Sequence, residues 1–133
     1  MTRPVAILML LVVISLAACN NTAASLPTPT LAGVGRKVSI AGAGSYTDVS
    51  PAELQKMLAC KDFTLVDVWT PYDGTIHGTD LFIHYTVFEK NLDKFPDKNA
   101  RIVLYCLGGE RSRILAETLV GLGYTNVYRL IGG

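Results

Sequence analysis

Short apolar runs of strand length alternate along the chain with stretches of helical spacing. Residues 63–68 and 101–105 are too short for helices and are rich in residues that suit a strand buried on both faces. Further strands are predicted at residues 46–49, 81–83 and 126–130. Strands that alternate with helices imply a parallel sheet covered by helices on both faces, so the predicted fold class is α/β.

Two of the predicted helices carry a capping-box pattern at their start. Ser50 and Glu53 form one such pattern, and Thr86 and Glu89 form the other. A proline at the first helical position supports the first of these helices. The two helices are expected to end near residues 60 and 95.

A third helix is predicted to begin near Arg111. Leu115, Leu119 and Leu122 recur at helical spacing and should form an apolar stripe that faces the core. Gly123 follows the stripe directly and is expected to terminate the helix as a C-cap residue.

Residues 1–18 have the pattern of an export signal. Arg3 precedes the apolar run Val5–Leu16, which is shorter than the ~17–25 residues of a spanning helix, so a cleaved signal is favoured over a permanent anchor. The run ends in Leu16-Ala17-Ala18-Cys19, which resembles the bacterial lipobox. We therefore expect Cys19 to carry a lipid that holds the protein on the extracytoplasmic face of a bacterial membrane, the cell membrane or the outer membrane. An ordinary secretory signal is the alternative.

Residues 19–44 are rich in Asn, Thr, Ala, Ser, Pro and Gly, which is typical of a flexible tether. Within this range, residues 36–40 are a weak candidate for an additional edge strand, because glycines flank them on both sides. The sequence thus predicts a signal peptide at 1–18, a tether at 19–44 and one folded domain at 45–133.

Charge and cysteine content narrow the possible chemistry. Lys and Arg total 12 against 11 Asp and Glu, and removal of Arg3 with the signal leaves 11 of each, so no basic field argues for nucleic acid. A disulfide between Cys60 and Cys106 is not expected, and Cys60 is predicted to be a small buried or half-buried hydrophobic residue. The sequence has no Cys-x-x-Cys motif and its two histidines have no ligand spacing, so no metal and no cofactor are predicted.

Cys106 stands between the run 101–105 and the third helix. Free N–H groups at a helix N-terminus form a concave anion site, which stabilises a thiolate and lowers the pKa of a cysteine placed there. Gly108 and Gly109 lack a Cβ that would block a tight curl, and Arg111 adds a fixed charge at the rim. In parallel sheets sites lie at the carboxyl ends of strands, which is where this cysteine is expected.

Three segments resemble the rhodanese-like domain family in the same order. Residues 106–112, Cys-Leu-Gly-Gly-Glu-Arg-Ser, match the pattern C-x-x-G-x-R-S. Residues 65–71 resemble L-[VI]-D-V-R-x-P, and residues 121–133 resemble the closing G-[FY]-x-N-V-x-x-L-x-G-G. The resemblance extends from about Tyr46 to Gly133. It implies a single rhodanese-like domain with a five-stranded parallel sheet and a cysteine that carries sulfane sulfur as a persulfide.

By this resemblance Cys106 is the catalytic residue and the residues after it form the substrate-binding loop, namely Leu107, Gly108, Gly109, Glu110, Arg111 and Ser112. Asp67 is expected to support the site by organising backbone N–H groups and Arg111. Arg111 itself could instead only form a surface ion pair with Asp67 or Glu117.

The sequence also departs from the family pattern. Trp69 stands where the family usually has Arg, which removes an expected charge near the site, and residues 74–79 look like a shortened form of G-H-I-P-G-[AS]. Glu110 is expected to repel an incoming dianion unless solvent draws its side chain away. Four residues separate Cys106 from Arg111, as in sulfurtransferases, whereas related phosphatases use C-x5-R to hold a larger anion.

The predicted function is a sulfurtransferase that works by double displacement. A small donor such as thiosulfate or polysulfide would load Cys106, and an external thiol or another nucleophile would remove the sulfur, because no second cysteine lies in the loop. The alternative from a different class is a non-catalytic rhodanese-like module that recruits a partner or holds polysulfide. A phosphatase ranks third on loop length.

Overall fold

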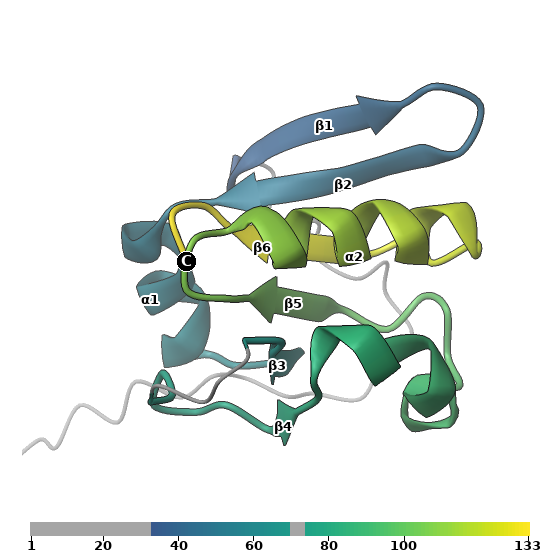
Figure 1. Cartoon of the computed structure of the whole chain (residues 1–133). Coiled ribbons are helices and arrows are strands. Elements are labelled where there is room, and N and C mark those ends of the chain that lie inside the picture. The colour runs from purple at the N-terminus through teal and green to yellow at the C-terminus, as the bar shows by residue number, and fades with distance from the viewer. Residues whose placement is uncertain (1–32, 70–73) are drawn as a thin grey trace, which may run out of the picture.

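The computed structural model describes residues 33–69 and 74–133. A sheet of six strands in the order β1-β2-β6-β5-β3-β4 forms its centre (Figure 1). The strands are β1 (Arg36–Ile40), β2 (Gly44–Val49), β3 (Thr64–Asp67), β4 (Leu81–Phe82), β5 (Ile102–Tyr105) and β6 (Val127–Leu130). The helices are α1 (Pro51–Ala59), the 3-10 helix η1 (Tyr85–Lys94) and α2 (Glu110–Gly121).

Five neighbouring strands of the sheet pair in parallel, as the sequence predicted, in the order β2, β6, β5, β3 and β4. The sixth strand, β1, pairs antiparallel with β2, so the prediction of a five-stranded, purely parallel sheet is wrong by one edge strand. This hairpin confirms the weak strand candidate at residues 36–40. It also places regular structure before residue 45, in the range where the composition favoured a tether.

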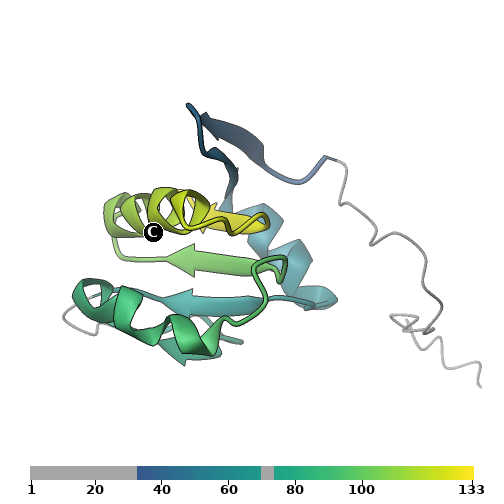
Figure 2. The same cartoon turned by 90° about the vertical axis from the view of Figure 1, so that its right-hand side faces the viewer.

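The sheet separates two apolar cores, because successive strand residues point to opposite faces. On one face α2 and η1 cover Val66 and Leu104, and Figure 2 shows α1 on the other side of the molecule from these two helices. On the α1 face, Leu65 and Val103 are fully buried under the helix. The central strands are therefore apolar on both faces, which explains their uninterrupted apolar runs.

Helix starts were predicted with mixed success. At α1 the Ser50 hydroxyl accepts the Glu53 N–H at 3.3 Å and a Glu53 oxygen accepts the Ser50 N–H at 2.7 Å, which confirms the capping box. The second capping box is wrong. The His84 imidazole instead accepts the Thr86 N–H at 3.2 Å, and the segment that follows is a 3-10 helix rather than an α-helix.

The α2 stripe is shorter than predicted. Leu115 and Leu119 are buried, but Leu122 lies just beyond the end of the helix and is 39 % exposed. Gly123 has a φ of +89°, the left-handed conformation that ends a helix cheaply only in glycine, so its predicted C-cap role is confirmed.

The predictions for the export signal at residues 1–18 and for lipidation of Cys19 lie outside the described residues. So do Thr70 and Pro71 of the motif at residues 65–71. Within the part of the chain that the structure describes, no helix is both long enough and apolar enough to cross a bilayer.

Candidate active site

Cys106 follows β5 directly, at the carboxyl edge of the parallel sheet. Its side chain is a free thiol and the residue is only 2 % exposed. The residues after it, which we call the cysteine loop (residues 106–112), turn back at once into α2, whose N-cap is Gly109. The expectation of a thiol between a strand end and a helix start is confirmed.

Hydrogen-bond donors of the cysteine loop surround the sulfur. The Ser112 N–H donates to the Cys106 Sγ at 3.5 Å, and the Cys106 thiol donates to the Ser112 Oγ at 3.6 Å. Burial by itself raises the pKa of Cys106, but the Ser112 N–H and hydroxyl and the N–H groups of Gly108 and Arg111 outweigh it. The net result is a pKa below the ordinary value of a thiol, so the site favours the thiolate.

Gly109 gives the loop its tight curl. Its φ is +78°, and a Cβ at this position would lie 3.3 Å from the Gly132 N atom. Its carbonyl accepts two hydrogen bonds, one from the Ser112 hydroxyl at 3.0 Å and one from the Arg129 guanidinium at 3.2 Å. The carbonyl is thus held out of the cradle, which leaves N–H groups facing the sulfur.

Arg129 on β6 connects this loop to the neighbouring strand β2. It donates from Nε to Asp48 on β2 at 2.7 Å, and Asp48 is 3 % exposed. Sequence reasoning missed both residues. The only signal in the sequence was one charged residue in each of two predicted strands. Their pairing could not be predicted, because the sequence does not show that β2 and β6 are neighbours.

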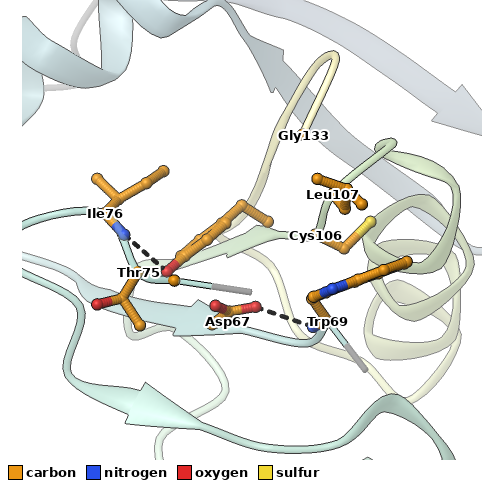
Figure 3. A pocket seen from close by; sticks show the side chains of 9 residues that line it. Asp67, Trp69, Thr75, Ile76, Cys106, Leu107 and Gly133 are labelled. Carbon is orange, nitrogen blue, oxygen red and sulfur yellow. Dashed lines mark hydrogen bonds between the residues drawn. The ribbon is translucent and has the colours of Figure 1, made fainter. Parts of the chain in front are cut away.

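A pocket of about 300 Å³ opens beside the thiol (Figure 3). Side chains from the ends of β3 and β5 line it together with the segment that precedes β4. The lining residues are Asp67, Trp69, Gly74, Thr75, Ile76, Tyr105, Cys106, Leu107 and Gly133. Most of the surface they offer is apolar or uncharged, and among the lining residues that the structure describes Asp67 has the single carboxyl group.

Asp67 holds a backbone N–H at the strand end, as expected, whereas the Arg111 guanidinium packs on the Trp69 and Tyr85 rings instead of pairing with it. Asp67 is 1 % exposed and accepts the Trp69 N–H at 2.9 Å. Burial raises the pKa of its carboxyl above the ordinary value, while hydrogen bonds from the Trp69 N–H and the Tyr105 hydroxyl oppose that rise. The Tyr105 hydroxyl also contacts Thr79 Oγ1 at 2.8 Å and accepts the Ile76 N–H at 3.1 Å, so it ties the floor of the pocket to the segment before β4.

Arg111 has neither of the ion-pair partners considered from the sequence. Its guanidinium lies over the Trp69 ring at 4.3 Å and over the Tyr85 ring at 4.9 Å. Such cation–π contacts are worth about 0.5–2 kcal/mol each, depending on desolvation. The guanidinium therefore packs against two aromatic rings, while the backbone N–H of the same residue stabilises the thiolate of Cys106.

The other loop and cysteine predictions have separate outcomes. Glu110 is exposed and its carboxylate pairs with Arg113 at 2.5 Å on the surface of α2, which draws it away from an incoming anion. Cys60 is exposed at the end of α1, so the prediction of a buried or half-buried residue is wrong, and Cys106 forms no bridge with it. In the described ranges no group of three or more His, Cys, Asp or Glu side chains could hold a metal ion.

Comparison with known proteins agrees with this geometry. The family model of the rhodanese-like domain matches residues 50–133. The chain belongs to the rhodanese-like domain family. Its fold is accordingly a single rhodanese-like α/β domain, here extended by the antiparallel strand β1.

Rhodanese-like relatives include both enzymes and structures named only for the domain. The human single-domain sulfurtransferase TSTD1 is 27% identical with a TM-score of 0.58, and the alignment covers 65% of this chain and 89% of that one. A rhodanese-like domain protein from Staphylococcus aureus is 30% identical with a TM-score of 0.57, over 65% of this chain and 85% of that one.

Curated relatives are considerably longer proteins. A tRNA uridine(34) hydroxylase of Picosynechococcus sp. is 33% identical over 99 residues, and that of Teredinibacter turnerae is 30% identical over 99 residues. Each match covers 68% of this chain but only 32% and 30% of the relatives. The chain thus spans about a third of the length of these proteins.

Proposed function

We propose that the protein is a sulfurtransferase that carries sulfane sulfur on Cys106. The observation that carries this proposal is the buried thiol inside a ring of N–H donors, with a pKa below the ordinary value and a pocket that opens onto it. Backbone donors of this kind stabilise a thiolate before reaction and an outer sulfur anion after it. The likeness to the single-domain sulfurtransferase TSTD1 supports the same chemistry.

The reaction is a double displacement. The Cys106 thiolate attacks the outer sulfur of a donor, the S–S bond of the donor breaks, and its electron pair leaves on the remaining fragment, which is sulfite when the donor is thiosulfate. A thiolate acceptor then attacks the outer sulfur of the persulfide. The bond to Sγ breaks, its electron pair returns to Cys106, and the acceptor leaves as a persulfide.

The cradle fits a single sulfur better than a phosphate. Four residues separate Cys106 from Arg111, and the Arg111 guanidinium is stacked between two rings rather than turned over the thiol. A phosphatase needs that guanidinium on the phosphate oxygens. The hydroxylation named for the longer relatives belongs to proteins of which the match covers only 32% and 30%.

Mass spectrometry of the full chain after exposure to thiosulfate or polysulfide tests the proposal. We expect the protein to gain the mass of one sulfur atom, to lose it on treatment with cyanide, and to show no gain in the Cys106→Ser variant. Absence of loading from every donor would overturn sulfur transfer and favour a non-catalytic module that binds a partner.

The pH dependence of loading gives a second readout. Because the pKa of Cys106 is lowered in the fold, the loading rate should rise with pH and reach its plateau below the ordinary pKa of a thiol. Ser112→Ala removes one hydrogen-bonding group from the sulfur and should therefore shift this rise to higher pH. An unchanged profile in Ser112→Ala would contradict the role of the cradle.

We further propose that the protein acts outside the cytoplasm, held to a membrane by lipid on Cys19. The support is the sequence of residues 1–19. Cell fractionation tests it. Cys19→Ala should block processing or release the protein from membranes, and unchanged processing together with unchanged membrane association would refute the anchor.

A further inference from the structure

Trp69, which lines the pocket together with Cys106, carries a hydrogen-bond donor that is not used within the described residues. Its indole Nε1 is buried and has no hydrogen-bond partner within the described part of the chain. A buried donor left unpaired costs about 1–3 kcal/mol, which a bound molecule can recover. Trp69 and Cys106 both line the pocket, and Figure 3 shows the indole extending along the side that holds the thiol.

The position of the indole is set by Arg111 and Asp67. The Arg111 guanidinium lies 4.3 Å from the Trp69 ring and is enclosed on its other side by Tyr85, while Asp67 accepts the Trp69 backbone N–H. Arg111 therefore packs on the ring and Asp67 holds the backbone of Trp69, and neither contact uses the indole N–H. A donor that is held in place and unpaired is suited to recognise a ligand.

The pocket also selects by charge. None of the described residues that line it is Lys or Arg, and the Arg111 guanidinium is packed against the Trp69 and Tyr85 rings. The ionisable carboxyl group in the pocket is Asp67, and a carboxylate opposes a dianion. Moving a dianion out of water into a pocket without a cation is costly, whereas the apolar side chains of Ile76, Leu107 and Trp69 favour an organic substituent.

Resting on the sulfur transfer proposed above, we propose that Trp69 is the specificity-determining residue of this site. Its indole N–H donates a hydrogen bond to the donor, and the pocket takes organic hydropersulfides with an apolar substituent in preference to the thiosulfate dianion. In this reaction the Cys106 thiolate attacks the outer sulfur of R–S–SH, the S–S bond breaks, and R–S⁻ departs with the electron pair. Cys106 is left as the hydropersulfide, so atoms and charge balance.

Steady-state kinetics on the full chain test this inference with two donors, benzyl hydropersulfide released in situ and thiosulfate. The wild-type protein should have a kcat/KM at least about tenfold higher for the hydropersulfide than for thiosulfate. A difference of this size corresponds to about one hydrogen bond. Trp69→Phe keeps a ring under Arg111 but removes the N–H, and should lower kcat/KM for the hydropersulfide by about five- to tenfold.

Two further variants separate donor selection from a structural effect. Trp69→Arg places a cation in the pocket and should shift the ratio of the two kcat/KM values toward thiosulfate by at least about tenfold. Tyr85→Phe keeps the stack on Arg111 and lies outside the pocket lining, so it should leave the ratio unchanged. Circular dichroism and melting temperature check the folding of each variant, and Trp69→Phe alone decides the case if Trp69→Arg does not fold.

The outcomes for the two proposals can be told apart. Loading from both donors with a wild-type preference for thiosulfate, or an unchanged hydropersulfide rate in Trp69→Phe, would overturn donor selection by Trp69 and leave sulfur transfer intact. No mass gain on Cys106 from either donor would overturn sulfur transfer, and the specificity inference with it.

Discussion

The pocket has two walls that are built in different ways. The cysteine loop presents backbone N–H groups to the sulfur, and these donors would be the same with almost any side chains. A second part of the lining, which we call the side-chain wall (Asp67 and Trp69), presents a carboxyl group and an indole. Backbone groups suit the chemistry common to all sulfur donors, whereas side chains discriminate between donors. The comparison assigns reactivity to one wall and selectivity to the other.

The largest effect is expected from the support behind the cysteine loop. Arg129→Met leaves the buried Asp48 carboxylate without its main partner and frees the Gly109 carbonyl. Breaking a buried pair on one side is strongly destabilising, so the free energy of unfolding should fall by about 3 kcal/mol. Urea unfolding measures this loss, and the loading rate of Cys106 should fall as well.

Arg36→Met is the matched control for this prediction. Arg36 contacts the same carboxylate at 2.9 Å, but its side chain is 79% exposed, so its loss should cost less than about 1 kcal/mol. Equal losses in the two variants would show that burial of the Arg129 pair does not support the loop.

A smaller effect is expected from the curl of the loop itself. Gly109→Ala forces a side chain into a φ of +78°, at a cost of about 1–2 kcal/mol, and should slow sulfur loading. Gly108→Ala is the control, because a Cβ there meets nothing within 4 Å and its φ is not positive. Similar loading rates in both variants would contradict the requirement for a left-handed residue at position 109.

The smallest effect concerns the side-chain wall. Arg111→Met removes the cation between Trp69 and Tyr85 and should lower the free energy of unfolding by about 1 kcal/mol. Trp69 is the single tryptophan, so the fluorescence emission of the protein should change when Arg111 no longer packs on the Trp69 ring. Arg113→Met, on the exposed face of the same helix, should leave the emission unchanged. Unchanged emission in Arg111→Met would show that the Arg111 guanidinium does not hold the Trp69 ring in place.

The two walls also differ in what the sequence could predict. The cysteine loop is contiguous, so its strand end, glycines and helix start could all be read from residues 101–112, and the structure places the thiol as expected. The direction of the Cys106 pKa follows from the same local argument. Local backbone chemistry was therefore predictable.

Interactions between distant segments were not. The pair of Asp48 and Arg129 spans 81 positions and depends on the order of strands in the sheet. The stack of Arg111 on Trp69 and Tyr85 joins three segments of the chain. From the sequence, Trp69 was noted only because it stands where the family usually has Arg. The His84 cap displaced a capping box with the correct spacing, because the chain enters η1 two residues earlier than the pattern indicated.

In the proposed sulfur transfer, the depth of Cys106 also limits which molecules can collect the sulfur. With 2 % of the residue exposed, access is through a pocket of about 300 Å³, so a flat protein surface cannot bring its own cysteine to the persulfide. An acceptor must be a small thiol or a cysteine at the tip of an extended segment. The pocket thus works as a size filter, and the same filter shields the loaded sulfur from bulky oxidants.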